Sequence, residues 1–140
     1  MSDARELIER LGLRHHPEGG WYLETWRAPS IGTERAASSA ILYLLAAGER
    51  SHWHRVDADE IWQYSAGDPL ELRVAVAAGA AVEIHRLGAG VAAGEEPQVV
   101  VPAGAWQAAR PLGRWTLVGC IVAPAFTFEG FELAPEGWEP

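Results

Sequence analysis

Two histidines and Glu60 stand close together between residues 48 and 69, in the stretch GERSHWHRVDADEIWQYSAGDP. His52 and His54 are two residues apart, and Glu60 lies at the start of the apolar run that follows. Side chains two apart in an extended segment share a face, so both imidazoles are expected to point the same way. Imidazole and carboxylate groups are ligands of divalent transition metals. One hypothesis is therefore a metal centre formed by His52, His54 and Glu60.

Glu60 and His54 allow other chemistry as well. A carboxylate within an apolar strand is costly to bury without a partner, and His54 can supply that partner. The pair could be a structural hydrogen bond, half of a metal site or a catalytic acid–base pair, and the sequence leaves these open. The remaining histidines are expected near solvent: His15 and His16 in a Gly/Pro-rich turn, and His85 on the polar side of a strand.

Aromatic residues of the same stretch indicate a ligand pocket. Trp62 and Tyr64 lie two and four residues after Glu60, so they share its face of the strand. Tryptophan and tyrosine combine a flat apolar body with one polar group, which suits the wall of a cavity. The chain has seven tryptophans. We expect Trp62, Tyr64 and Trp21 to line a pocket for a small molecule.

One short helix and a series of strands must position these side chains. Asp3, Glu6 and Gly12 mark a capped helix over residues 3–12. Beyond Gly12, short β-rich runs alternate with Gly and Pro and show no second helical period, which favours an all-β barrel or sandwich. Further strands are expected at residues 21–27, 38–46, 70–76, 98–101, 106–110 and 114–123.

Three segments are less regular. Residues 82–86 are expected to form the second strand of a hairpin, with Val82 and Ile84 facing inward. Residues 88–96 are rich in Gly and Ala and predict a loop over the barrel. The tail, residues 126–138, is too aromatic for a disordered end. Its aromatic side chains are expected to pack either on the outside of their own barrel or at a subunit interface.

Composition limits the classes of partner. The formal charge is −8, and no lysine is present among the eleven basic residues. This charge argues against nucleic acid and anionic membrane surfaces, because phosphates would be repelled. The single Cys120 excludes an intrachain disulfide and fits a reducing compartment. The charged first 14 residues exclude a secretory apolar segment, and no apolar run is long enough for a membrane span. We expect a cytoplasmic protein.

Four blocks in order resemble one protein family. They read HPEGGWYLET, SHWHRVDADEIW, VPAGAWQAAR and LVGCIVAPAFTFEGFELA. The chain is similar to the cupin superfamily, and more closely to its DUF985 (Cupin_5) group. The resemblance implies a single cupin domain over residues 1–140, with a jelly-roll β-barrel over about residues 20–134 and a pocket that often holds a metal.

Two departures from the cupin motifs bear on the site. Gln107 stands where the second motif has a histidine, so Gln107 is expected in the pocket, facing Glu60 and completing a metal shell only as a weak ligand. Five residues separate His54 from Glu60, where the general motif has three or four. A second register is therefore open, in which His54 takes the first histidine position and Val56 the second.

The resemblance and the residues together leave three functions open. The first is an enzyme in which a divalent metal or a His54–Glu60 acid–base pair acts on a small polar metabolite. The second is a metal-free sugar isomerase or epimerase, and the third is a non-catalytic small-molecule-binding protein. A homodimer is expected under each, because a two-fold interface would cover exposed aromatics and an open sheet edge.

Overall fold

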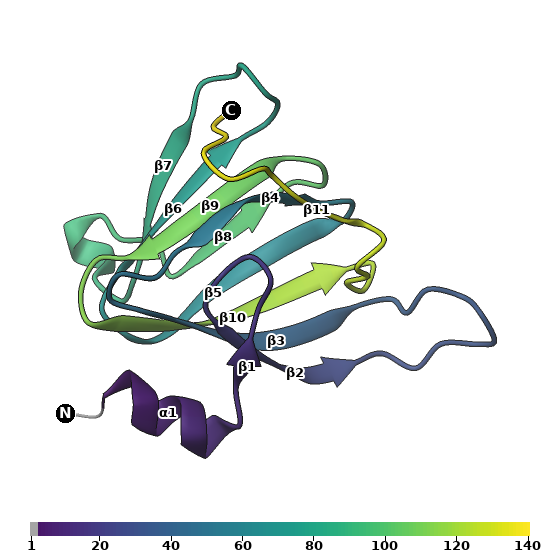
Figure 1. Ribbon diagram of the computed structural model, residues 1–140, viewed down its shortest axis with the longest axis horizontal. Coiled ribbons are helices and arrows are strands. Elements are labelled where there is room, and N and C mark those ends of the chain that lie inside the picture. The colour runs from purple at the N-terminus through teal and green to yellow at the C-terminus, as the bar shows by residue number, and fades with distance from the viewer. Residues whose placement is uncertain (1–2) are drawn as a thin grey trace.

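The computed structural model describes residues 3–140, in which two antiparallel sheets face each other (Figure 1). The six-stranded sheet has the order β1-β2-β3-β10-β5-β8, and the five-stranded sheet has the order β11-β4-β9-β6-β7. This is the expected all-β jelly-roll architecture. The strands are β1 (Arg14–His15), β2 (Trp21–Arg27), β3 (Ser39–Ala46), β4 (Ser51–Val56), β5 (Asp59–Gly67), β6 (Leu70–Ala75), β7 (Glu83–Leu87), β8 (Gln98–Val101), β9 (Trp106–Pro111), β10 (Trp115–Ala123) and β11 (Phe131–Leu133).

The only helix longer than one turn in the described residues is α1 (Ala4–Leu11). The Asp3 carboxylate accepts the backbone N–H of Glu6 at 2.9 Å, and Gly12 ends the helix in a left-handed conformation with φ 69°. Both caps agree with the sequence-based prediction. Within residues 3–140, no helix is long and apolar enough to cross a membrane.

The space between the sheets is filled at one end only. Neighbouring inward positions of three strands pass from a packed core to a cavity: Tyr43 then Ile41 on β3, Trp62 then Glu60 on β5, and Cys120 then Val122 on β10. The core cluster consists of Tyr43, Leu45, Trp62, Leu70, Leu72, Val74, Leu87, Val99, Val101, Ala105, Ala109, Val118 and Cys120. Because side chains alternate between the two faces of each strand, the inward-facing positions of one strand supply both core residues and part of the cavity wall.

The expected orientation of the hairpin strand is wrong. Val82 and Ile84 are 38% and 61% exposed, whereas Leu87 is fully buried opposite Leu70. Directly paired residues share a face of the sheet, so the inward set is shifted by one residue from the expected one. His85 consequently lies half-buried, with Nδ1 2.7 Å from Glu96 Oε2.

The segment after β7 has some structure of its own. It contains one short 3₁₀ turn, η1 (Val91–Ala93), and Glu96 bridges to Leu87 at the end of β7. Arg86 of β7 also donates to Glu95 at 3.1 Å. The residues of this segment therefore lie beside the edge strand, and the lining of the cavity described below does not include them.

The C-terminal tail packs against its own sandwich, which was the first of the two expected alternatives. β11 pairs with β4, and the Trp138 ring lies 4.4 Å from the Trp106 ring. Phe126 and Phe131 pack near His16, with ring separations of 6.4 and 6.0 Å. The tail thus closes one side of the cavity end.

Candidate active site

A cavity of about 330 Å³ lies at the unfilled end of the sandwich. Four ionisable side chains form its polar floor: His16, Glu18, His54 and Glu60. Its walls are mainly apolar and come from both the sheets and the tail, namely Tyr22, Ile41, Val56, Val122, Phe126 and Phe128. An enclosed space with a few convergent polar groups is typical of small-molecule sites.

The HPEGG turn between β1 and β2 brings His16 and Glu18 into the cavity. Its paired glycines have φ of 111° at Gly19 and 76° at Gly20, in the region that side chains avoid. A Cβ added at Gly19 would lie 2.0 Å from the carbonyl oxygen of Arg50, so the turn is in direct contact with the chain leading into β4. His16 is only 8% exposed, which corrects the expectation that this turn is solvated.

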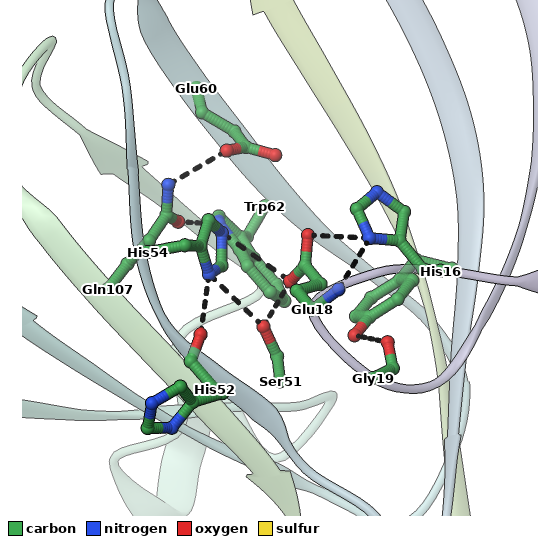
Figure 2. Close-up of polar contacts among 10 residues, drawn as sticks. His16, Glu18, Gly19, Ser51, His52, His54, Glu60, Trp62 and Gln107 are labelled. Atoms are coloured by element: carbon green, nitrogen blue, oxygen red, sulfur yellow. Dashed lines mark hydrogen bonds and ion pairs between the residues drawn. The ribbon is translucent and has the colours of Figure 1, made fainter. Parts of the chain in front are cut away.

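Glu18 was missed by the sequence reasoning, although it is central to the floor (Figure 2). Its Oε2 accepts a hydrogen bond from the Ser51 hydroxyl and lies 3.4 Å from Nε2 of His54. Its Oε1 lies 3.3 Å from Nδ1 of His16. The available signal was an acid in a turn with two consecutive glycines, a pattern that permits close approach of the backbone to the rest of the fold.

His54 presents one nitrogen to the cavity. Its Nδ1 lies 2.8 Å from the backbone carbonyl of His52, and a carbonyl can only accept. Nδ1 therefore carries the proton, and Nε2 of the neutral ring offers its lone pair toward Glu18. The ring is buried and packs against Phe131 at 5.5 Å, which fixes its orientation.

Glu60 is held by a chain of hydrogen bonds on the side away from the cavity. Gln107 Nε2 donates to Glu60 Oε1 at 2.9 Å, and Trp62 Nε1 donates to Gln107 Oε1 at 2.7 Å. Glu60 and Gln107 were expected to face each other across the pocket, whereas the structure places them in direct contact. Gln107 lies behind Glu60 and not in the cavity lining.

Burial sets the protonation of the floor. Loss of hydration raises the pKa of Glu18 to about 8, although hydrogen bonds from Ser51 and Tyr43 oppose this. The same cause raises the pKa of Glu60 to about 7, with attraction to His54 opposing it. Burial, with a smaller contribution from repulsion by His54, lowers the pKa of His16 to about 4. Burial also lowers the pKa of His54. Near pH 7 both imidazoles and Glu18 are therefore neutral, and Glu60 is partly ionised.

His52 does not join this floor. An irregularity in the pairing of β4 with β9 between Ser51 and His54 breaks the alternation on which the sequence argument relied. Figure 2 shows the His52 ring turned away from His54. Its Nε2 lies 2.9 Å from the carbonyl of Pro135, on the outer face of the sheet. His54 and Val56 both line the cavity, as the second register expected.

Three aromatic residues expected in the pocket lie elsewhere. Trp62 is one position deeper than Glu60 on the same face and belongs to the packed core. Tyr64 lies two residues farther along β5, partly buried against that core, and its hydroxyl donates to the carbonyl of Gly67 at 2.6 Å. Trp21 donates from Nε1 to Glu49 at 3.1 Å and stacks on His15 at 3.7 Å. The aromatic wall consists instead of Tyr22, Phe126 and Phe128.

The residues expected to hold a metal do not fit a metal shell. Of that set, His54 and Glu60 line the cavity, while His52 lies outside it and both ends of the Gln107 amide are already bonded. Among residues 3–140, no group of three or more His, Cys, Asp or Glu side chains is placed to hold a metal ion. A divalent metal therefore stays a prediction that the ligand geometry does not support.

Comparison with known proteins places these features in a family. The family model Cupin_5, described as Cupin superfamily (DUF985), matches residues 5–134. The chain belongs to the Cupin_5 family. The match includes the HPEGG turn, β4 with His54, β5 with Glu60 and the aromatic tail, so every element of the cavity lies within the family domain. No curated protein sequence matches the chain significantly.

Solved structures support this assignment. A protein from Shewanella oneidensis is 38% identical with a TM-score of 0.89, and the alignment covers 96% of this chain and 85% of that one. A protein from Leishmania major is 33% identical with a TM-score of 0.87, covering 95% and 88%. Oxalate decarboxylase from Bacillus subtilis is 12% identical with a TM-score of 0.65, covering 85% and 29%. That last likeness concerns the fold alone.

Proposed function

We propose that this Cupin_5 protein is an enzyme that moves protons on a small organic molecule, using its own carboxyl and imidazole groups. The observation that carries the proposal is the pair formed by Glu18 Oε2 and His54 Nε2, 3.4 Å apart at the cavity floor, with Glu60 beside it. Buried groups that exchange a proton near neutral pH are what acid–base catalysis requires.

The surroundings of the two carboxyl groups give each a role. Glu60 ionises first, at a pKa of about 7, and is the general base. Glu18 keeps its proton to a pKa of about 8 and is the general acid, and the Nε2 lone pair of His54 lies 3.4 Å from its Oε2. Ser51 and Gln107 hold the two carboxyl groups in place from behind. Glu60 thus lies on a strand itself, and Glu18 is held by a residue of a strand, so both carboxyl groups are fixed in position.

Hydrogen exchange at carbon provides a test that does not require the natural substrate. The protein is incubated in D₂O with a panel of small carbonyl compounds and amines, and loss of each C–H signal is followed by proton NMR. We expect exchange at one or more of these compounds with wild-type protein and a loss of about 10²–10⁴-fold with Glu60→Gln. Compounds that bind in the cavity without any catalysed exchange would contradict the proposal.

A second candidate is a non-catalytic binding protein. It is favoured by one observation: both floor carboxyl groups already have hydrogen-bond partners within the protein, so the network could serve only to hold the cavity open. The exchange experiment separates the two, because a binding protein would give saturable binding with equal exchange rates in wild type and Glu60→Gln. A sugar isomerase or epimerase is one form of the proton-transfer proposal and would show exchange with hydroxy-carbonyl compounds.

A further inference from the structure

We propose that the cavity binds a small molecule with a positive charge, an amine or an onium group, and holds this charge beside Glu60. The inference rests on the proposed function and deepens it by naming the charge of the substrate. It is carried by the charge inventory of the cavity and by the residues of its walls.

The cavity lining contains more carboxyl groups than cations. Its acids are Glu18, Glu24, Glu60 and Glu129, and its one permanent cation is Arg27. Arg27 already donates to Glu24 at 2.7 Å and to the carbonyl of Phe126 at 3.0 Å, so this guanidinium is bound at the rim. The two floor carboxyl groups therefore lack a permanent cation as partner within the lining.

The missing partner has a physical cost. Glu18 and Glu60 are both buried, and a buried carboxylate is stabilised only by hydrogen bonds or an opposite charge. Ser51, Gln107 and Cys120 supply neutral hydrogen bonds, and the imidazoles of His16 and His54 are uncharged near pH 7. A ligand cation would supply the opposite charge, whereas an anion would add repulsion.

The walls suit the same ligand. Tyr22, Phe126 and Phe128 line the cavity, and the rings of the two phenylalanines meet edge to face, 5.0 Å apart. Aromatic faces attract cations through the ring quadrupole, and clusters of them recognise quaternary ammonium groups. At ~30 Å³ for each water-sized group, the cavity has room for about ten non-hydrogen atoms.

The experiment compares three probes of similar shape by isothermal titration calorimetry at pH 7.5: benzylamine, benzyl alcohol and benzoate. We expect benzylamine to bind at least about tenfold more tightly than benzyl alcohol, and benzoate more weakly than either. Because the cation favours the ionised form of Glu60, binding of benzylamine should release protons, seen as a difference in heat between phosphate and Tris buffers. Equal or tighter binding of benzyl alcohol, binding without proton release, or no binding of any probe would overturn the inference.

Phenyltrimethylammonium, whose charge does not titrate, gives the pH dependence. Its affinity should rise between pH 5 and 8.5, as Glu60 becomes ionised. Glu60→Gln should weaken its binding about tenfold at pH 7.5, whereas Glu9→Gln, the same change on the exposed helix, should leave it unchanged. Equal binding in these two variants would count against the charge pairing.

The outcomes separate this inference from the proposed function. Catalysed C–H exchange on neutral compounds, together with no preference for benzylamine, would overturn the cation site and leave the proton-transfer proposal standing. Tight binding of benzylamine with proton release but no exchange on any amine or carbonyl compound would support the cation site and contradict the enzyme.

Discussion

Glu18 and Glu60 lie in one cavity and differ in what surrounds each carboxyl group. Glu18 is enclosed by the HPEGG turn, Ser51 and Tyr43, whereas Glu60 lies on a strand and accepts a hydrogen bond from Gln107. Their pKa values of about 8 and about 7 place one acid and one base in the same cavity near neutral pH. When the surroundings of two carboxyl groups separate their pKa values in this way, the group with the higher pKa is assigned as the acid and the other as the base.

The pH profile of the exchange reaction follows from this difference. Activity should rise as Glu60 ionises near pH 7 and fall as Glu18 loses its proton near pH 8, which gives a narrow bell between these values. Rates of C–H exchange measured from pH 5 to 10 with one compound well below saturation would show it, because such rates report the pKa values of the free protein. Glu18→Gln should remove the alkaline limb, and a profile that is flat across pH 6–9 in wild type would be inconsistent with both roles.

Stability should also depend on Glu18. In the unfolded chain this carboxyl ionises near its ordinary pKa of 4.5, whereas the folded protein holds the proton up to about pH 8. Unfolding therefore releases a proton in that window, and the free energy of unfolding falls with rising pH by up to ~1.4 kcal/mol per pH unit. Urea unfolding between pH 5 and 9 should show a steeper decline for wild type than for Glu18→Gln. Parallel pH curves for the two proteins would refute the assignment.

At the level of elements, the HPEGG turn decides whether Glu18 reaches the cavity. Gly19 combines a positive φ with contact to the carbonyl of Arg50, while Gly32 has a positive φ with open space around it. Gly32→Ala should cost about 1–2 kcal/mol, the strain of the left-handed backbone alone. Gly19→Ala should cost more, because its Cβ must push the turn away from the start of β4. Thermal unfolding of the two variants gives the comparison, and equal losses would show that the turn is not held against β4.

The helix, the strands and the site residues show what the sequence could and could not predict. The helix caps and most strand ranges followed from local patterns and family resemblance. The place of His52 did not, because an irregularity in strand pairing is a property of two strands and leaves no mark in the spacing of one. The burial of His16 and Glu18 was missed for a related reason: composition identifies a turn, but not the surface against which it packs.

At the level of the whole molecule, the homodimer stays a prediction. The tail aromatics, which were one candidate for the subunit interface, pack mostly within the chain. Other apolar surface must therefore form the dimer interface. A row of directly paired residues crosses the outer face of the six-stranded sheet: Trp26, Ala40, Ile121, Ile61 and Val100. Trp26 and Val100 are 52% and 57% exposed, and a two-fold contact would cover this row on both copies.

Light scattering tests this assembly. We expect a mass twice the 15.2 kDa of one chain for wild type. Ile121→Arg should shift the protein toward monomer, because it places a charge in the middle of the row. Ile31→Arg, which adds the same charge to an exposed loop residue outside the row, should leave the dimer intact. A wild-type mass of one chain at micromolar concentration would end the prediction.

Direct titration of the two floor carboxyl groups tests the central claim without any substrate. Protein labelled with ¹³C at the glutamate side-chain carboxyl is followed by NMR from pH 4 to 10, and Glu18→Gln and Glu60→Gln identify the two signals. We predict that the Glu60 signal titrates near pH 7 and the Glu18 signal near pH 8, and that each is absent from the corresponding variant. Midpoints below pH 5 for both groups would mean that the two carboxyl groups are fully ionised at neutral pH, which would contradict the proton-transfer account.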